Sequence, residues 1–406
     1  MGMQLSSSEV TARSRPAPSG TLGAMRVALI AVAVAAALVG GLAVACGGDD
    51  AAPAPTATSL RPSTTPAATT LQPASTGAAI TAATTATTVA ANSVTSIPST
   101  PTLAAIPKFE LGEYRVTKGS RPHDVAPAAD GTVWYTAQGS GRLGRLTPQG
   151  LGIKEIPLGP GSAPHGVIIG PDGAPWVTDG GQNAIVRVDP ETFAVKVYAL
   201  PAGRGNANLN TAAFDQRGVL WFTGQAGIYG RLDIVTGKMD VYDAPRGAGP
   251  YGIVATPAGD IYYASLAGSH IAKIDRETGA ATPIEPPTAG QGARRVWSDS
   301  QGNIWVSEWN AGQLARYDPV AKAWKEWRLP GTGPRAYAVY VDDDDWVWVT
   351  DFGANAILRF DPVTEKWDSF PIPQANAAVR QLLGRPGEVW GAESGTDTLI
   401  VVRTAK

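Results

Sequence analysis

The sequence contains very little cysteine and histidine and no concentration of positive charge. One cysteine, Cys46, occurs among 406 residues, which excludes an intrachain disulfide framework and a cysteine-rich zinc site. The formal net charge is −2, and the Lys and Arg residues form no dense patch that could bind a phosphate backbone. We therefore expect no nucleic-acid partner. No G-x-S-x-G elbow and no H-E-x-x-H motif occurs among the 406 residues.

Aromatic residues are absent from the first hundred positions, and every Trp lies at position 134 or later. Residues 27–45 form an uncharged apolar run, with arginines before it and aspartates after it, and this charge order predicts export of the rest of the chain. The run ends in "AVAC", which resembles a bacterial lipoprotein signal in which Cys46 is lipidated. An uncleaved membrane anchor and ordinary secretion after removal of a signal peptide remain alternatives, because 19 apolar residues can also span a bilayer.

The sequence therefore divides into three parts. Residues 1–46 are predicted to be an export signal or membrane anchor, so the protein is expected on the extracytoplasmic face of the cell membrane. Residues 47–107 are rich in Ala, Thr, Ser and Pro and cannot bury enough apolar surface to fold, so we predict a disordered linker. Residues 108–406 carry all the aromatic repeats and are predicted to be one folded domain.

This third part consists of seven repeats. Each has an aromatic residue inside a short apolar strand, usually after a Gly-containing turn, and successive aromatics lie 41 to 45 residues apart. The seven aromatics are Trp134, Trp176, Trp221, Tyr262, Trp305, Trp348 and Trp390. Four short strands per repeat predict an all-β, seven-bladed β-propeller in which these aromatics pack between blades. The last repeat supplies only three strands, so we expect the strand at 109–116 to complete that blade and close the ring.

Two positions of the repeat are expected at the same mouth of the central channel, because the first strand of a blade starts there and the second ends there. The strand-one position holds His123, His165, Asn210, Tyr251, Arg294, Tyr337 and Arg380. The strand-two position holds carboxylates in four blades, namely Asp179, Glu308, Asp351 and Glu393. Convergent polar groups at a channel mouth can bind a polar ligand, hold a cation or move protons.

These residues suggest specific roles, each with a structural alternative. We predict His165 as a general base, with His123 beside it as a second catalytic group that contacts the substrate. The substrate-binding residues are then Tyr251, Arg294, Tyr337 and Arg380, and the four carboxylates are candidate metal ligands. We also expect Asp179 to orient His165 or to help hold a cation. A carboxylate at that position can instead accept N–H bonds from a loop, and an arginine can simply pair with it.

The repeat unit resembles that of the streptogramin lyases, also called virginiamycin B lyases. The shared pattern is P-[HY]-G-[IV], then DG-x-[LI]-W-[FV]-T-[ED], then N-x-I-x-R-[IVL]-D-P and [YW]-x-[LI]-P, over residues 108–406. The resemblance implies a seven-bladed propeller that opens a cyclic depsipeptide by elimination at its ester bond. It also implies magnesium, which polarises a carbonyl, and a histidine base, which removes the proton from the neighbouring carbon.

The chain departs from the family where the family places its chemistry. The family has a "PH" in the sixth blade, an "EPH" in the seventh and a glutamate that closes strand two of the seventh. The two histidine positions are occupied here by Tyr337 and Arg380, and only Glu393 matches, as a metal-binding carboxylate.

The two "PH" pairs stand instead in the first and second blades, at His123 and His165. Asp179 follows His165 at the family's spacing, so the family's site looks rotated by two blades. Ala163 replaces the glutamate of "EPH".

The resemblance thus predicts an extracytoplasmic virginiamycin B lyase-like protein, which would act in antibiotic resistance. Two alternatives remain: a non-catalytic propeller that binds a small molecule, envelope ligand or protein at the channel mouth, and a lactonase-like hydrolase on the same scaffold.

Overall fold

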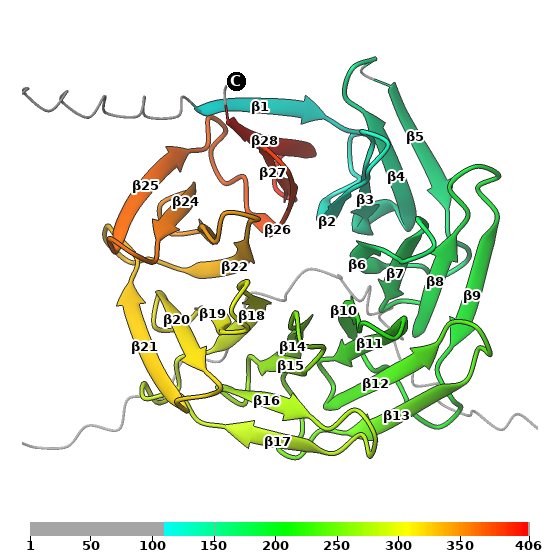
Figure 1. Cartoon of the computed structure of the whole chain (residues 1–406). Coiled ribbons are helices and arrows are strands. Elements are labelled where there is room, and N and C mark those ends of the chain that lie inside the picture. The colour runs from blue at the N-terminus through cyan, green and yellow to red at the C-terminus, as the bar shows by residue number, and fades with distance from the viewer. Residues whose placement is uncertain (1–108, 151, 405–406) are drawn as a thin grey trace, which may run out of the picture. The chain divides into compact units, whose positions relative to one another are not determined.

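The computed structural model describes residues 109–150 and 152–404, and the predicted export segment and linker lie outside this range. The described chain forms 28 β-strands and one short 3-10 helix, η1 (Gln138–Ser140). The strands form seven four-stranded antiparallel sheets, arranged as blades around a common centre (Figure 1). The predicted seven-bladed propeller is therefore confirmed. Within the described range, no helix has the length and apolar character needed to cross a membrane.

Blades are numbered by the order of their first strands, and each strand lies outside the one before it. Blades 1 to 3 contain β2 (Pro122–Pro127), β3 (Val133–Ala137), β4 (Arg142–Thr147) and β5 (Gly152–Pro157); β6 (Pro164–Ile169), β7 (Pro175–Asp179), β8 (Ala184–Val188) and β9 (Val195–Ala199); and β10 (Leu209–Phe214), β11 (Val219–Gly224), β12 (Ile228–Asp233) and β13 (Met239–Asp243). Blades 4 to 6 contain β14 (Pro250–Ala255), β15 (Ile261–Ser265), β16 (His270–Ile274) and β17 (Ala281–Ile284); β18 (Ala293–Ser298), β19 (Ile304–Glu308), β20 (Gln313–Asp318) and β21 (Ala323–Arg328); and β22 (Ala336–Val341), β23 (Val347–Asp351), β24 (Ala356–Asp361) and β25 (Lys366–Pro371).

Blade 7 is built from both ends of the described chain. It contains β26 (Val379–Arg385), β27 (Glu388–Glu393), β28 (Thr398–Thr404) and, as its outermost strand, β1 (Phe109–Arg115). β1 pairs antiparallel with β28, from Phe109 opposite Thr404 to Arg115 opposite Thr398 (Figure 1, cyan against red). The predicted closure by the N-terminal strand is confirmed, and it covers a sheet edge that would otherwise be left unpaired.

The repeated aromatics are buried between blades. Trp176 on β7 packs against Leu209 and Leu220 of blade 3, for example. The Trp176 indole Nε1–H donates to Asp172 Oδ1 in the turn between β6 and β7, at 3.1 Å. The same indole-to-carboxylate bond recurs in four other blades, in the pairs Trp221–Asp215, Trp305–Asp299, Trp348–Asp342 and Trp390–Glu388. The predicted packing role of these aromatics is confirmed, and the bonds satisfy N–H groups that burial removes from water.

The first strand of every blade contains a register shift near its start. In blade 2 the shift lies just before Gly166, where Thr178 Oγ1 of β7 accepts the Gly166 N–H at 2.9 Å. The same hydroxyl donates to the carbonyl oxygen of Asn210 in blade 3 at 2.5 Å. Ser307 makes the two corresponding bonds in blade 5. Because a bulge breaks the alternation of a strand, two consecutive residues can reach the centre of the ring.

Candidate functional site

The strand-one side chains meet at the centre of the ring and form a first layer, which contains His123, His165, Asn210, Tyr251, Arg294, Tyr337 and Arg380. The six of these predicted as site residues are brought together. Tyr251 Oη and Tyr337 Oη, from blades 4 and 6, are hydrogen-bonded at 2.6 Å across the intervening blade 5. Arg380 Nη1 donates to Tyr337 Oη at 3.4 Å, and the ring of His165 lies 5.8 Å from that of Tyr251. The first layer therefore closes the channel near the upper mouth, where the first strands begin.

The two histidines lie side by side, with ring centroids 3.8 Å apart. His165 Nδ1–H donates to the Asn210 carbonyl oxygen at 3.0 Å, and His165 Nε2 accepts from Asn210 Nδ2 at 3.2 Å. His123 Nδ1 lies 2.8 Å from Asp124 Oδ1. A carboxylate on one imidazole nitrogen fixes the ring and favours proton uptake at the other nitrogen. The histidine that a carboxylate orients is therefore His123, through Asp124.

Arg294 lies inside an aromatic box. Its guanidinium carbon lies 3.6 Å from the ring centroid of Tyr337, 4.6 Å from that of Tyr251 and 4.9 Å from that of Trp309. Arg294 Nη2 also donates to Tyr251 Oη at 3.1 Å. Cation–π contacts of this kind stabilise a buried guanidinium. Arg294 and the two tyrosines are fully buried, so they fill the channel rather than present a surface to a ligand.

A second layer lies next to the first and consists of Asp124, Thr211, Arg295 and Gln381, from blades 1, 3, 5 and 7. Arg295 spans the channel: its Nη2 lies 2.9 Å from Asp124 Oδ1 and its Nη1 lies 3.3 Å from Asp124 Oδ2. Arg295 Nη1 also donates to Thr211 Oγ1 at 2.8 Å. Burial alone would lower the pKa of Arg295, but the attraction of Asp124 outweighs it and holds that pKa above its ordinary value. Arg295 therefore remains a cation.

Sequence reasoning missed this second layer. Adjacent residues of a regular strand face opposite sides, so only the first of each pair was expected at the channel. A signal was available, because the position after each first-layer residue reads Asp124, Gly166, Thr211, Gly252, Arg295, Ala338 and Gln381, with polar and small residues alternating round the ring. The small residues leave room. A Cβ on Gly166 would lie 2.7 Å from the Asn210 carbonyl oxygen, and one on Gly252 would lie 2.7 Å from the Arg295 Cα.

Asp179 lies at the predicted end of strand two, and its contacts are with its own loops. Its Oδ1 accepts the N–H groups of Ala163, Gly181 and Gln182 at 2.9 to 3.1 Å. Its Oδ2 accepts from Ser162 Oγ at 2.5 Å. Asp351 is placed likewise in blade 6, where its Oδ1 accepts two loop N–H groups at 2.8 Å. These contacts match the loop-binding alternative for the strand-two carboxylates.

Glu308 and Glu393 are buried and poorly solvated. Glu308 Oε2 accepts from Gln313 Nε2 at 2.5 Å, and Glu393 Oε2 accepts from Thr396 Oγ1 at 2.5 Å. Burial raises the pKa of Glu308 to about 8. Burial also raises the pKa of Glu393 to about 7, and the nearby Glu113 carboxylate adds to that rise. Both side chains therefore carry a proton for much of the time near neutral pH.

The predicted metal ligands do not share a site. In the described ranges, one group of three side chains has ligand atoms that all lie within 4.8 Å of one another, and it consists of His123, Asp124 and His165. Magnesium prefers an octahedral shell of oxygens, whereas this group offers two imidazoles and one carboxylate. That carboxylate is already paired with Arg295, whose charge opposes a cation. The described residues do not suit magnesium, and the magnesium requirement stays a prediction.

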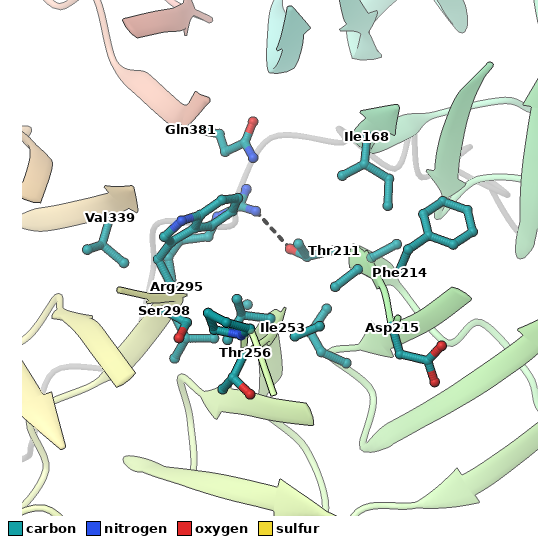
Figure 2. Close-up of a pocket in the computed structure, with 18 of the residues that line it drawn as sticks. Ile168, Thr211, Phe214, Asp215, Ile253, Thr256, Arg295, Ser298, Val339 and Gln381 are labelled. Atoms are coloured by element: carbon teal, nitrogen blue, oxygen red, sulfur yellow. Dashed lines mark hydrogen bonds between the residues drawn. The ribbon is translucent and has the colours of Figure 1, made fainter. Parts of the chain in front are cut away.

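A cavity of about 550 Å³ lies beyond the second layer, at the lower mouth where the first strands end (Figure 2). Its walls come mainly from the ends of β6, β10, β14 and β18 and from the turns that follow them. Most of the wall side chains are apolar and include Ile168, Phe214, Ile253, Trp297 and Val339. The inner end of the cavity is polar, where Arg295, Thr211 and Gln381 line it. Figure 2 shows the hydrogen bond from Arg295 to Thr211 at this end.

The two mouths therefore differ in what they can do chemically. At the upper mouth the histidine rings are enclosed, since His123 is 1% and His165 is 2% exposed. Proton transfer to a substrate requires the base within hydrogen-bond reach of that substrate. At the lower mouth the cavity has the size and the mostly apolar lining of a small-molecule site.

Comparisons with known proteins agree with this fold. The sequence model of the virginiamycin B lyase family matches residues 71–322. The solved structure of selenomethionine-substituted virginiamycin B lyase from Staphylococcus aureus has a TM-score of 0.68 and 22% identity, over 73% of this chain and 100% of that chain. A catalytically inactive variant of the same enzyme with quinupristin has the same TM-score, identity and coverage.

A more distant likeness is to the extracellular domain of a protein described as a hybrid two-component system, from B. thetaiotaomicron. It has a TM-score of 0.55 and 16% identity, over 72% of this chain and 41% of that chain. No curated protein matches the sequence. At these identities the solved structures share the fold alone, whereas the family match extends over more than half of the sequence. The chain belongs to the virginiamycin B lyase family.

Proposed function

We propose that this protein is a ligand-binding member of its family, which holds a small molecule in its channel without opening a depsipeptide ester. The enclosure of the two histidines carries the proposal, because His123 and His165 are 1% and 2% exposed. An elimination would require one of these imidazoles to touch the carbon that loses its proton. The side chains of the first layer enclose both imidazoles and leave no room beside them for that carbon.

The way in which the first layer is bonded also favours binding over catalysis. A substrate that approached from the upper mouth would have to break the Tyr251–Tyr337 hydrogen bond and displace Arg294 from its aromatic box. Leaving these buried polar groups without partners costs about 1–3 kcal/mol each. A buried network of hydrogen bonds and cation–π contacts of this kind fixes one arrangement of side chains.

The proposed location is the extracytoplasmic side of the cell membrane. The apolar run that ends at Cys46 predicts export, and lipidation or an uncleaved helix would then tether the domain. The likeness to the extracellular domain of a hybrid two-component system supports that location. A ligand of the cell envelope is the partner class that suits such a protein.

One observation favours the lyase prediction as a second candidate. His123 and His165 lie 3.8 Å apart between ring centroids, and Asp124 orients His123. In that case His123 would remove the proton, and His165 would act beside it after the first layer had opened. The ester C–O bond would break with release of a carboxylate, and a C=C bond would form. The proton taken up by the imidazole would pass to that carboxylate or to water, so the ring-opened acid would have the mass of the substrate.

An assay with virginiamycin B separates the two candidates. The purified full-length protein is incubated with virginiamycin B with and without magnesium, and the products are followed by liquid chromatography and mass spectrometry. The virginiamycin B lyase of S. aureus is the positive control. We expect no opened product. A ring-opened isomer of unchanged mass that disappears in both His123→Ala and His165→Ala would contradict the binding proposal, and a product heavier by one water would indicate a hydrolase.

A further inference from the structure

We propose that the cavity at the lower mouth is the ligand site, and that its ligand is a compact, mostly apolar molecule with one carbonyl oxygen that binds the guanidinium of Arg295. This inference rests on the proposed function and names the ligand class. The site lies at the opposite mouth of the channel from the residues that the sequence pattern selects.

The apolar walls of the cavity indicate that most of the ligand surface is apolar. Ile168, Ile253 and Val339 come from three different blades and line one space with the aromatic rings of Phe214 and Trp297. A volume of about 550 Å³ lies within the range of 300–1,000 Å³ that is typical of small-molecule sites. Flat aromatic and aliphatic molecules gain most from such walls, because their burial removes apolar surface from water.

Arg295 indicates which polar group the ligand carries. Its two terminal nitrogens are bonded to Asp124 and Thr211, whereas its Nε–H has no hydrogen-bond partner among the described residues. The side chain of Arg295 is 4% exposed, so water has little access to that donor. A buried guanidinium with an unfilled donor is costly, so Arg295 at the inner end of the cavity favours a ligand that brings an acceptor oxygen to this end.

The ion pair decides which acceptor is favoured. Asp124 already neutralises Arg295, so a second carboxylate would bring a negative charge into an apolar cavity without a full positive charge to balance it. A neutral ketone, ester or amide oxygen accepts the same hydrogen bond without that penalty. The chemical class is therefore a neutral carbonyl compound rather than a fatty acid or other anion.

The entrance of the cavity lies on the side where the described chain begins. β1 is antiparallel to β28, β28 to β27, and β27 to β26, so β1 starts at the face where β26 ends. That face is the lower mouth. β1, the first described strand, therefore begins at the same face as the cavity.

The test uses two probes that differ in the carbonyl alone, 2-acetylnaphthalene and 2-ethylnaphthalene. Binding to the full-length protein is measured by isothermal titration calorimetry and by quenching of tryptophan fluorescence. We expect 2-acetylnaphthalene to bind about tenfold more tightly, because one hydrogen bond to a buried donor contributes roughly that factor. Equal affinity of the two probes, or no binding of either, would overturn the inference.

Three variants locate the site. Ala255→Phe fills the cavity and should abolish the binding of both probes, whereas Ala226→Phe fills a hollow near the upper mouth and should change neither. The double variant Asp124→Leu with Arg295→Met should keep the binding of 2-ethylnaphthalene and lose the preference for 2-acetylnaphthalene. Unchanged binding in Ala255→Phe, or a preference that survives in the double variant, would contradict the assignment.

Failure of this inference is distinguishable from failure of the proposed function. Opening of virginiamycin B overturns the proposed function, whatever the naphthalenes do. Loss of the carbonyl preference overturns the cavity assignment, whatever happens to virginiamycin B.

Discussion

Glu308 should make the stability of the propeller fall as pH rises. Its side chain is fully buried at the end of β19, Oε2 accepts from Gln313, and Oε1 has no hydrogen-bond partner among the described residues. Burial raises the pKa of Glu308 from an ordinary value of 4.5 to about 8. The folded protein therefore binds a proton at pH values where the unfolded chain has released it.

The sign and size of the effect follow from this difference. Below pH 4.5 both states are protonated, and Glu308 contributes no pH dependence. Above pH 4.5 the free energy of unfolding falls by about 1.4 kcal/mol per pH unit until the folded-state pKa is reached. The loss is about 3 kcal/mol at pH 7 and about 5 kcal/mol above pH 8.

The variant Glu308→Gln keeps the shape of the side chain and cannot ionise. It should exceed the wild type by less than about 1 kcal/mol at pH 5, by about 3 kcal/mol at pH 7 and by about 5 kcal/mol at pH 9. The measurement is urea unfolding followed by tryptophan fluorescence at the three pH values. Glu191→Gln removes one charge from an exposed turn and serves as the control. A stability difference that does not change with pH would refute the reasoning.

Two further predictions concern the channel and the joints between blades. Asp124→Asn should lower the free energy of unfolding by about 3–5 kcal/mol, because it leaves Arg295 charged and buried without a carboxylate. The double variant Asp124→Leu with Arg295→Met should be close to neutral. Equal losses of stability in the two variants, measured by urea unfolding, would contradict this. Thr178→Val should lower the free energy of unfolding by about 1–3 kcal/mol, because it removes the hydroxyl that joins Gly166 to Asn210. Thr178→Ser keeps that hydroxyl and should retain most of the stability. An unchanged midpoint of thermal unfolding in Thr178→Val would argue against this role for the hydroxyl.

The repeat made the architecture predictable, since the spacing of the aromatics gave the number of blades and the unpaired strand at 109–116 gave the closure. The first layer was predictable for the same reason, because equivalent positions in a repeat meet at the centre of the ring. Arg295 and Asp124 were missed because a regular strand alternates its faces, and the bulge that turns both residues inward depends on hydroxyls from the neighbouring strand.

For the four strand-two carboxylates, the sequence predicted the position in the blade but not the direction of the side chain. Their place at the end of strand two was foreseen, but the direction of their side chains depends on loop N–H groups that need acceptors. Asp179 accepts three such groups, so the loop it belongs to decides where it points. The cavity had no sequence signal, because its walls are assembled from strand ends whose apolar residues resemble ordinary core.

The pairing of β1 with β28 also has a consequence for biosynthesis. β1 is made before every other strand described here, and its partner is made last, so nearly the whole described chain must be synthesised before blade 7 can form. Until then, β1 has no partner strand, and blades 1 and 6 each expose the side that blade 7 later covers. These exposed surfaces can associate with other chains. If the protein crosses the membrane as an extended chain, the ring can close only after the last strand has emerged, so its folding should be completed entirely on the far side.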